Sequence, residues 1–287
     1  VGVLTRLLHQ TRDHFGAKII FSDHQRVAKR RMTGIQYAKG EKQRKPLYKQ
    51  LLKKTHKVLG YATNASATLS QNAAADIRIL GIINDIEHFS TLTQRVIGQT
   101  ERRVIHGKTV PAQEKVVSIF EEHTDIIIKD RRDTHYGHKI CLTGGASNLI
   151  LDCMILEGNP ADTDLVEQML DRQQQIYGRY PLKVALDGGF ASKDNLIKAK
   201  DRKIKDVCFA KKRGLKKTDM CRSEYVYKKL RRFRAGIESG ISWLKRSFGL
   251  TRCTWKGFRS FKCYVLASVV AANLLTMARK KLAVAIE

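Results

Sequence analysis

The order of apolar runs after Pro111 constrains the fold of this chain more than any other feature. Four short apolar runs come first, and the chain then alternates helix, strand, helix, strand. The period of the pattern predicts strands near residues 116–120, 126–128, 139–142, 149–156, 182–186 and 206–210, with helices near 162–177 and 193–200. Several strands followed by helix–strand alternation indicate an α/β fold with a mixed sheet.

The first 110 residues follow a helical pattern instead. Their apolar residues recur at helical spacing in three groups: Val3, Leu4, Leu7 and Leu8; Leu47, Leu51, Leu52 and Val58; Ile77, Leu80, Ile83 and Ile86. Residues 64–75 are small and polar, which indicates a loop or a weak helix start. We therefore expect a basic helical region at residues 1–110, which is an insertion or a DNA-contacting part, and an α/β domain at residues 111–283. The element order of that domain fits the ribonuclease-H-like topology.

The formal net charge of +27 favours a polyanionic partner. Lys and Arg are concentrated in residues 1–60 and 193–262, whereas the stretch between these two blocks is nearly neutral. Nucleic acid suits such a charge because neutralised phosphates release their counterions. Within the first block, Lys49, Lys53 and Lys57 recur every four residues on one helix face. That stripe could lie along a phosphate backbone, or it could only keep the helix soluble.

An anionic membrane is the alternative partner for a basic chain. Spanning a bilayer takes about 20 apolar residues, and the best candidate, residues 264–278, is interrupted by Ser268, Asn273 and Thr276. We expect that stretch to be a buried helix, and we expect no membrane partner. The six cysteines include no Cys-x-x-Cys pair, which predicts reduced thiols in a cytoplasmic protein.

Two acidic residues stand out in this basic chain. Asp187 follows the apolar strand at 182–186 and precedes two glycines, at the strand end where α/β sheets place ligands. A simple Asp-Gly turn is the other interpretation. Glu238 lies on a helix that has an apolar stripe of Ile237, Ile241, Leu244 and Phe248.

Glu238 shares its helix face with Arg231, Arg234 and Lys245. This set is either an ion-paired surface stripe or a carboxylate that holds a divalent metal beside cations that hold phosphates. Trp255, next to Lys256, is a candidate for stacking on a DNA base, whereas Trp243 is expected in the core.

Several segments of the second half resemble bacterial insertion-sequence transposases of the DDE superfamily, in the large groups four and five. The resemblance covers roughly residues 111–280. It includes the Arg-x3-Glu-x6-Lys spacing of the family's Tyr-Arg-Glu-Lys signature, which Arg234, Glu238 and Lys245 meet, with Arg231 in place of the tyrosine. The segments are Tyr136-Gly-His-Lys-Ile, Glu157-Gly-Asn-Pro-Ala-Asp, Val184-Ala-Leu-Asp-Gly-Gly-Phe-Ala-Ser, Phe209-Ala-Lys-Lys-Arg-Gly, Phe233-Arg-Ala-Gly-Ile-Glu-Ser-Gly-Ile-Ser-Trp-Leu-Lys-Arg and Cys253-Thr-Trp-Lys-Gly-Phe-Arg-Ser-Phe.

The resemblance implies a metal-dependent DNA strand cleavage and transfer reaction that uses Mg²⁺ or Mn²⁺ held by three carboxylates. Asp187 would be the second Asp and Glu238 the final Glu. The implied partners are the terminal inverted repeats and the target DNA, bound by a homodimer in the bacterial cytoplasm at the nucleoid. The candidate DNA contacts are Arg231, Arg234, Lys245, Arg246, Trp255 and Lys256.

The first Asp of the set is expected on an opening strand that precedes the helical region. Asp125, Asp130 and Asp133 are the candidates within the chain, but they fall among later strands. We therefore expect the first Asp upstream of Val1, so that the domain lacks its first strand and the chain is an incomplete, inactive copy. The alternatives are a non-catalytic DNA-binding remnant and a structure-specific nuclease with the same fold.

Overall fold

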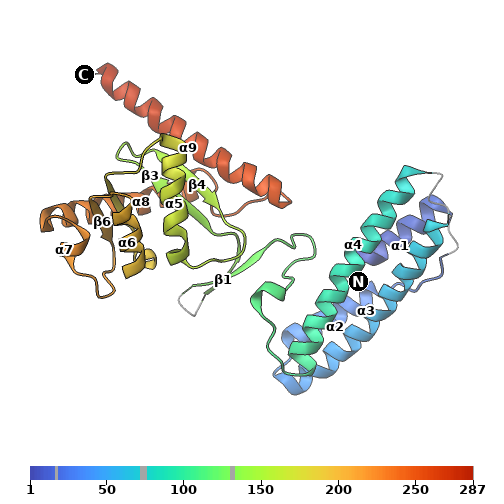
Figure 1. Cartoon of the computed structure of the whole chain (residues 1–287). Helices are drawn as coiled ribbons and strands as arrows, with labels where there is room; N and C mark the ends of the chain where they lie inside the picture. The colour runs from blue at the N-terminus through green and yellow to red at the C-terminus, as the bar shows by residue number, and fades with distance from the viewer. Residues whose placement is uncertain (17–18, 72–75, 130–132, 287) are drawn as a thin grey trace. The chain divides into compact units, whose positions relative to one another are not determined.

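A computed structural model describes residues 1–16, 19–71, 76–129 and 133–286, and it divides into two units (Figure 1). Unit 1 comprises Val1–Thr124 and unit 2 comprises Asp125–Glu287. The sequence pattern changes earlier, at Pro111, and the residues between Pro111 and Thr124 belong to unit 1.

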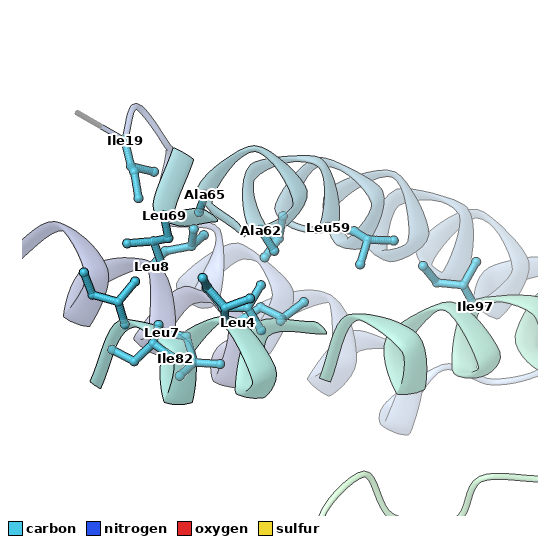
Figure 2. Close-up of a cluster of buried hydrophobic side chains, with 14 of the residues drawn as sticks. Leu4, Leu7, Leu8, Ile19, Leu59, Ala62, Ala65, Leu69, Ile82 and Ile97 are labelled. Carbon is cyan, nitrogen blue, oxygen red and sulfur yellow. The ribbon is translucent and has the colours of Figure 1, made fainter. Parts of the chain in front are cut away.

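The described part of unit 1 contains helices α1 to α4, which are followed along the chain by a π-helical turn, η2, and a short 3₁₀ turn, η3. In chain order they are α1 (Gly2–Phe15), α2 (Gln25–Tyr37), α3 (Glu41–Ser70), α4 (Ile77–Thr100), η2 (Glu101–Ile105) and η3 (Ala112–Glu114). Asp76 caps α4, because its side chain accepts a hydrogen bond from the Arg78 backbone N–H at 2.8 Å. Aliphatic side chains of α1, α3 and α4 form the core of the unit, and Figure 2 shows Leu4, Ala62 and Ile82 among them.

Two local predictions for unit 1 were wrong. Residues 64–70 continue helix α3, because Ala65 and Leu69 are buried in this core; residues 72–75 lie outside the described residues. The helix predicted from the spacing of residues 77–86 is confirmed as α4; its buried stripe is Ile79, Ile82, Ile83 and Ile86, whereas Ile77 and Leu80 face solvent.

The other wrong prediction is the strand at 116–120, which does not form. The Gln99 side chain satisfies both backbone groups of Val116 instead. It donates to the carbonyl oxygen at 3.0 Å and accepts from the N–H at 2.9 Å.

Unit 2 has an α/β composition. Its elements are β1 (Asp125–Lys129), β2 (Asp133–Gly137), β3 (Ile140–Gly144), β4 (Ile150–Ile155), α5 (Asp162–Tyr177), β5 (Lys183–Leu186), η4 (Gly188–Phe190), α6 (Lys193–Asp201), β6 (Asp206–Phe209), α7 (Lys217–Met220), α8 (Glu224–Ser247) and α9 (Phe258–Ile286). The described strands pair two by two. The β1–β2 and β3–β4 pairs are antiparallel and the β5–β6 pair is parallel. The described residues therefore do not form one continuous mixed sheet.

Helix α5 joins the β3–β4 and β5–β6 pairs. Its Val166 and Leu170 belong to the core around β5 and β6, whereas its Leu165 and Met169 pack in the cluster that contains Cys141 of β3 and Met154 of β4. An ion pair reinforces the second contact, because Arg172 makes two hydrogen bonds of 2.6 Å to the buried carboxylate of Asp152 on β4.

The side chain of Asn273 bonds helix α9 to β4. The Asn273 amide donates to the Ile150 carbonyl at 2.8 Å and accepts from the Ile150 N–H at 2.9 Å, as a neighbouring strand would. The helix is not the buried one predicted from the sequence. By length and composition Phe258–Ala283 could cross a membrane, and only 22% of its most apolar stretch is buried. Leu266, Val270 and Leu274 are exposed.

All six cysteines are free thiols. Burial is the main cause that raises the pKa of Cys141, Cys153 and Cys208 to about 11. At neutral pH these three side chains are therefore protonated and poorly nucleophilic.

Candidate catalytic site

Asp187 lies at the carboxyl end of the parallel strand pair. Strand β5 is in register with β6, with Leu186 opposite Phe209, and the Ala210 N–H donates to the Leu186 carbonyl at 3.0 Å. The Asp187 side chain accepts from the Gly188 N–H at 2.6 Å, which caps η4. Its carboxylate is 66% exposed. It is therefore fixed at its base and open to a ligand at the edge where α/β sheets bind ligands.

The two positions after Asp187 have no room for a Cβ, so both require glycine. Neither has a positive φ. A Cβ on Gly188 would lie 2.8 Å from the side chain of Lys211, and one on Gly189 would lie 2.0 Å from the carboxylate of Asp162. Both neighbours thus lie against the turn that carries Asp187. The sequence reasoning missed them, although the parallel pairing of 182–186 with 206–210 would have placed Lys211 at this edge.

Gly189→Ala is therefore expected to destabilise the protein by about 1–3 kcal/mol. The new methyl group would displace the Asp162 carboxylate, which Lys139 holds at 2.5 Å. Chemical denaturation would measure the loss. Gly236→Ala on α8 is the matched control, because a Cβ there meets nothing within 4 Å and alanine is the better helix former. Equal stability of the two variants would contradict the close packing of Asp162.

Glu238 is carried to the same edge by helix α8. Ser223 caps the helix, since its hydroxyl accepts from the Val226 N–H at 3.2 Å. Tyr227 and Leu230 are buried in the core of β5 and β6. The predicted apolar stripe is on the inner side of α8, with Leu244 buried and Ile237, Ile241 and Phe248 partly buried. The Glu238 side chain is 61% exposed.

Arg234 joins the two acidic residues. Its Nη1 is 2.7 Å from a Glu238 carboxylate oxygen and 3.5 Å from an Asp187 oxygen. These two oxygens are therefore at most 6.2 Å apart, the sum of the two distances. The hydrogen bond to Glu238 raises the pKa of Arg234, and burial opposes this rise. The Arg234 Nε is buried and has no hydrogen-bond partner among the described residues. Arg234 thus ion-pairs with the acidic residues, as in the surface-stripe interpretation.

The two carboxylates fit part of a divalent-metal site. They approach one cationic nitrogen, and they are exposed enough for water to complete a coordination shell, which Mg²⁺ prefers. Within the described ranges, no group of three or more His, Cys, Asp and Glu side chains is arranged to hold a metal. Of the candidates for a third carboxylate, Asp125 is 3.1 Å from His138 Nδ1, Asp133 begins β2, and Asp130 lies outside the described residues.

The predicted DNA contacts fall on two segments. Arg231, Lys245 and Arg246 are exposed on α8, and no ion pair forms to any of them within the described part of the chain. Trp255, 53% exposed, and Lys256 lie in the loop before α9, where the Trp255 ring packs edge-on against Tyr264. Trp243 is partly buried and contacts Phe248, in keeping with its expected core role.

An Asp at the end of a parallel strand and a Glu on a later helix, with cations around them, are a combination typical of metal-dependent enzymes that act on phosphates. Residues 98–274 match the family model described as the transposase DDE domain. The chain therefore belongs to the DDE transposase family, whose members move DNA segments and generally use divalent metal ions. No curated protein and no solved structure matches the chain.

Proposed function

We propose that this chain is an insertion-sequence transposase in which Asp187 and Glu238 bind Mg²⁺ or Mn²⁺ on a ribonuclease-H-like domain. The approach of both carboxylates to the Arg234 guanidinium carries the proposal, because residues 51 positions apart are brought to one cation. Asp187 and Glu238 would hold the divalent ion, which would supply activation of a water or a 3′-hydroxyl and charge stabilisation of the leaving oxygen at phosphorus.

The residues around the pair bind the DNA. The exposed cations Arg231, Lys245, Arg246 and Lys256 neutralise backbone phosphates, and they position the strand without reading its sequence. The exposed face of Trp255 offers a surface on which a base can stack. In the active assembly two copies hold the paired element ends, and the protein acts on the nucleoid in the cytoplasm.

By this proposal Asp187 and Glu238 are two of the three carboxylates that a complete two-metal site uses, and the described residues contain no group of three or more His, Cys, Asp and Glu side chains arranged to hold a metal. We therefore propose that this polypeptide on its own binds DNA but does not cleave it. Such a chain would bind DNA without cleaving it, as a DNA-binding remnant of a transposase does, and it would still have Asp187 and Glu238 to bind a metal.

The proposal is tested with the full chain, Mn²⁺ and DNA that carries the element's ends. Electron paramagnetic resonance of free Mn²⁺ should show weak binding that Asp187→Asn or Glu238→Gln lowers at least about tenfold, which corresponds to about 1.4 kcal/mol. Asp201→Asn, an exposed carboxylate without an ion pair among the described residues, should leave it unchanged. Equal Mn²⁺ affinity in all variants would contradict the metal site.

A cleavage assay on the same DNA tests completeness. We expect salt-sensitive binding without nicking, and we expect Asp187→Asn to keep that binding. Nicking that Asp187→Asn abolishes would refute the incomplete site while supporting the carboxylate pair. Hydrolysis without joining of a 3′-end would identify a nuclease instead.

A further inference from the structure

Unit 1 has a groove along helix α3 that the proposed function does not use. Two adjoining hollows, of about 640 and 600 Å³, share Ile105 and His106 at the end of η2. Helix α3 forms one wall of both hollows, and the end of α4 with η2 forms the other. We call these hollows together the α3–η2 groove.

Cations dominate the lining of the α3–η2 groove. Arg44, Lys45, Arg103 and Lys115 line the first hollow, and Lys49, Lys53 and Lys57 line the second. Glu41 and Glu101 are the acidic residues of the lining, and Glu101 is 3.5 Å from His56. No ion pair forms to any of the seven cations among the described residues of unit 1. The groove therefore carries a net positive charge that the protein itself does not neutralise.

One of these cations, Lys57, also affects the pKa of His24. Burial lowers the pKa of His24, and the positive charges of Lys54 and Lys57 lower it further. These positive charges disfavour a further cation, such as protonated His24, and attract an anion.

Both walls of the α3–η2 groove are held in place. Helix α3 is anchored by Val58 and Leu59 in the core of unit 1, where Figure 2 shows Leu59. The segment that carries Lys115 is fixed by the Gln99 bonds to Val116 and by the ion pair of Arg102 with Glu114. The cations therefore stand on fixed backbone, which lowers the entropic cost of binding a ligand.

The dimensions of the groove fit a nucleic-acid strand. Lys45, Lys49, Lys53 and Lys57 recur every four residues, so their positions span about 18 Å of helix at about 1.5 Å per residue. One strand of B-DNA places about five phosphates over that length, at about 3.4 Å each. An amphipathic membrane-binding face would need protruding apolar side chains, and none of the exposed large apolar residues described in unit 1 lines the hollows.

We propose that the α3–η2 groove is a binding site for the phosphate backbone of nucleic acid, separate from the carboxylate pair of unit 2. The site does not depend on metal binding by Asp187 and Glu238. It binds without sequence preference, because phosphate contacts carry no base information.

The test compares two triple variants of the full chain that lose the same charge. One is Lys45→Gln/Lys49→Gln/Lys53→Gln in the groove. The other, the control, is Lys203→Gln/Lys205→Gln/Lys216→Gln, which replaces exposed lysines of unit 2 that have no ion pair among the described residues. Glutamine keeps helix propensity, and circular dichroism verifies the fold of both variants.

Binding of a labelled 20-base-pair duplex is followed by anisotropy against salt concentration. The groove variant should lose at least about tenfold in affinity at low salt, and its log–log salt slope should fall by about 2–3, since each phosphate contact contributes about 0.9. The control should stay within about threefold of the wild type. Equal losses in the two triple variants would overturn the proposal, because net charge alone would explain them.

Two further arms separate the alternatives. Vesicles that contain anionic lipid test for a membrane surface, and a groove-specific loss of vesicle binding without a loss of duplex binding would also overturn the proposal. Asp187→Asn is expected to leave the salt slope of duplex binding unchanged. If the groove variant loses duplex affinity as expected while Asp187→Asn binds Mn²⁺ as tightly as the wild type, the carboxylate site is refuted and the groove proposal is not.

Discussion

Phe209→Ala is expected to lower the free energy of unfolding by about 3–5 kcal/mol. Phe209 ends β6, is 0% exposed, and is among the largest fully buried side chains of the protein. It packs with residues of α5, β5 and α8, so its removal leaves a cavity where these elements meet. The change in denaturation midpoint at constant m-value measures the effect.

Tyr225→Ala is the matched control for Phe209→Ala. Tyr225 is an aromatic residue of the same unit, on α8, and is 73% exposed, so its loss should change stability by less than about 0.5 kcal/mol. Phe209→Leu, which fills most of the space, should cost much less than Phe209→Ala. If Phe209→Ala and Tyr225→Ala lowered the free energy of unfolding equally, the burial of Phe209 would not stabilise the β5–β6 core that positions Asp187.

The elements that could be predicted from sequence are those with a strong local signal. Residues 162–177 form α5 as expected, because the helix is preceded by Pro160 and stopped by Gly178, which adopts the left-handed conformation. Strands β5 and β6 also lie at the predicted runs. In each case the pattern of apolar residues and breakers is contained within one segment.

The wrong predictions depend on contacts between distant segments. Val116 is taken out of a strand by the side chain of Gln99, 17 residues away. Helix α9 is apolar, yet it is held to β4 through Asn273 and leaves much of its apolar surface exposed. Strand pairing also depends on contacts between distant segments, because the periodicity of a strand does not show which other strand it pairs with.

The candidate site shows the same division. Asp187 and Glu238 could be selected from sequence because a strand end and a helix face are local features. The bridge that Arg234 makes between them depends on the packing of α8 against β5 and β6. The sequence left Arg234 either in an ion-paired stripe or in contact with phosphate; in the structure it ion-pairs with both carboxylates, and its contact with DNA stays a prediction.

Arg234→Gln is expected to strengthen Mn²⁺ binding at the Asp187 and Glu238 pair by about tenfold, or about 1.4 kcal/mol. In the structure the guanidinium is hydrogen-bonded to the Glu238 oxygen at 2.7 Å and faces Asp187. A divalent ion must compete with this positive charge for the same carboxylates, and like charges at such separations repel strongly. Glutamine keeps a polar side chain of similar reach but removes the charge.

Arg231→Gln is the control for Arg234→Gln, because Arg231 is on the same helix and no ion pair joins it to a carboxylate among the described residues. It should change Mn²⁺ affinity by less than about threefold, since solvent and salt screen exposed charges. Both variants should weaken DNA binding if both arginines reach phosphates. Weaker Mn²⁺ binding in Arg234→Gln would contradict this competition. It would mean that Arg234 holds the two carboxylates in position for the metal.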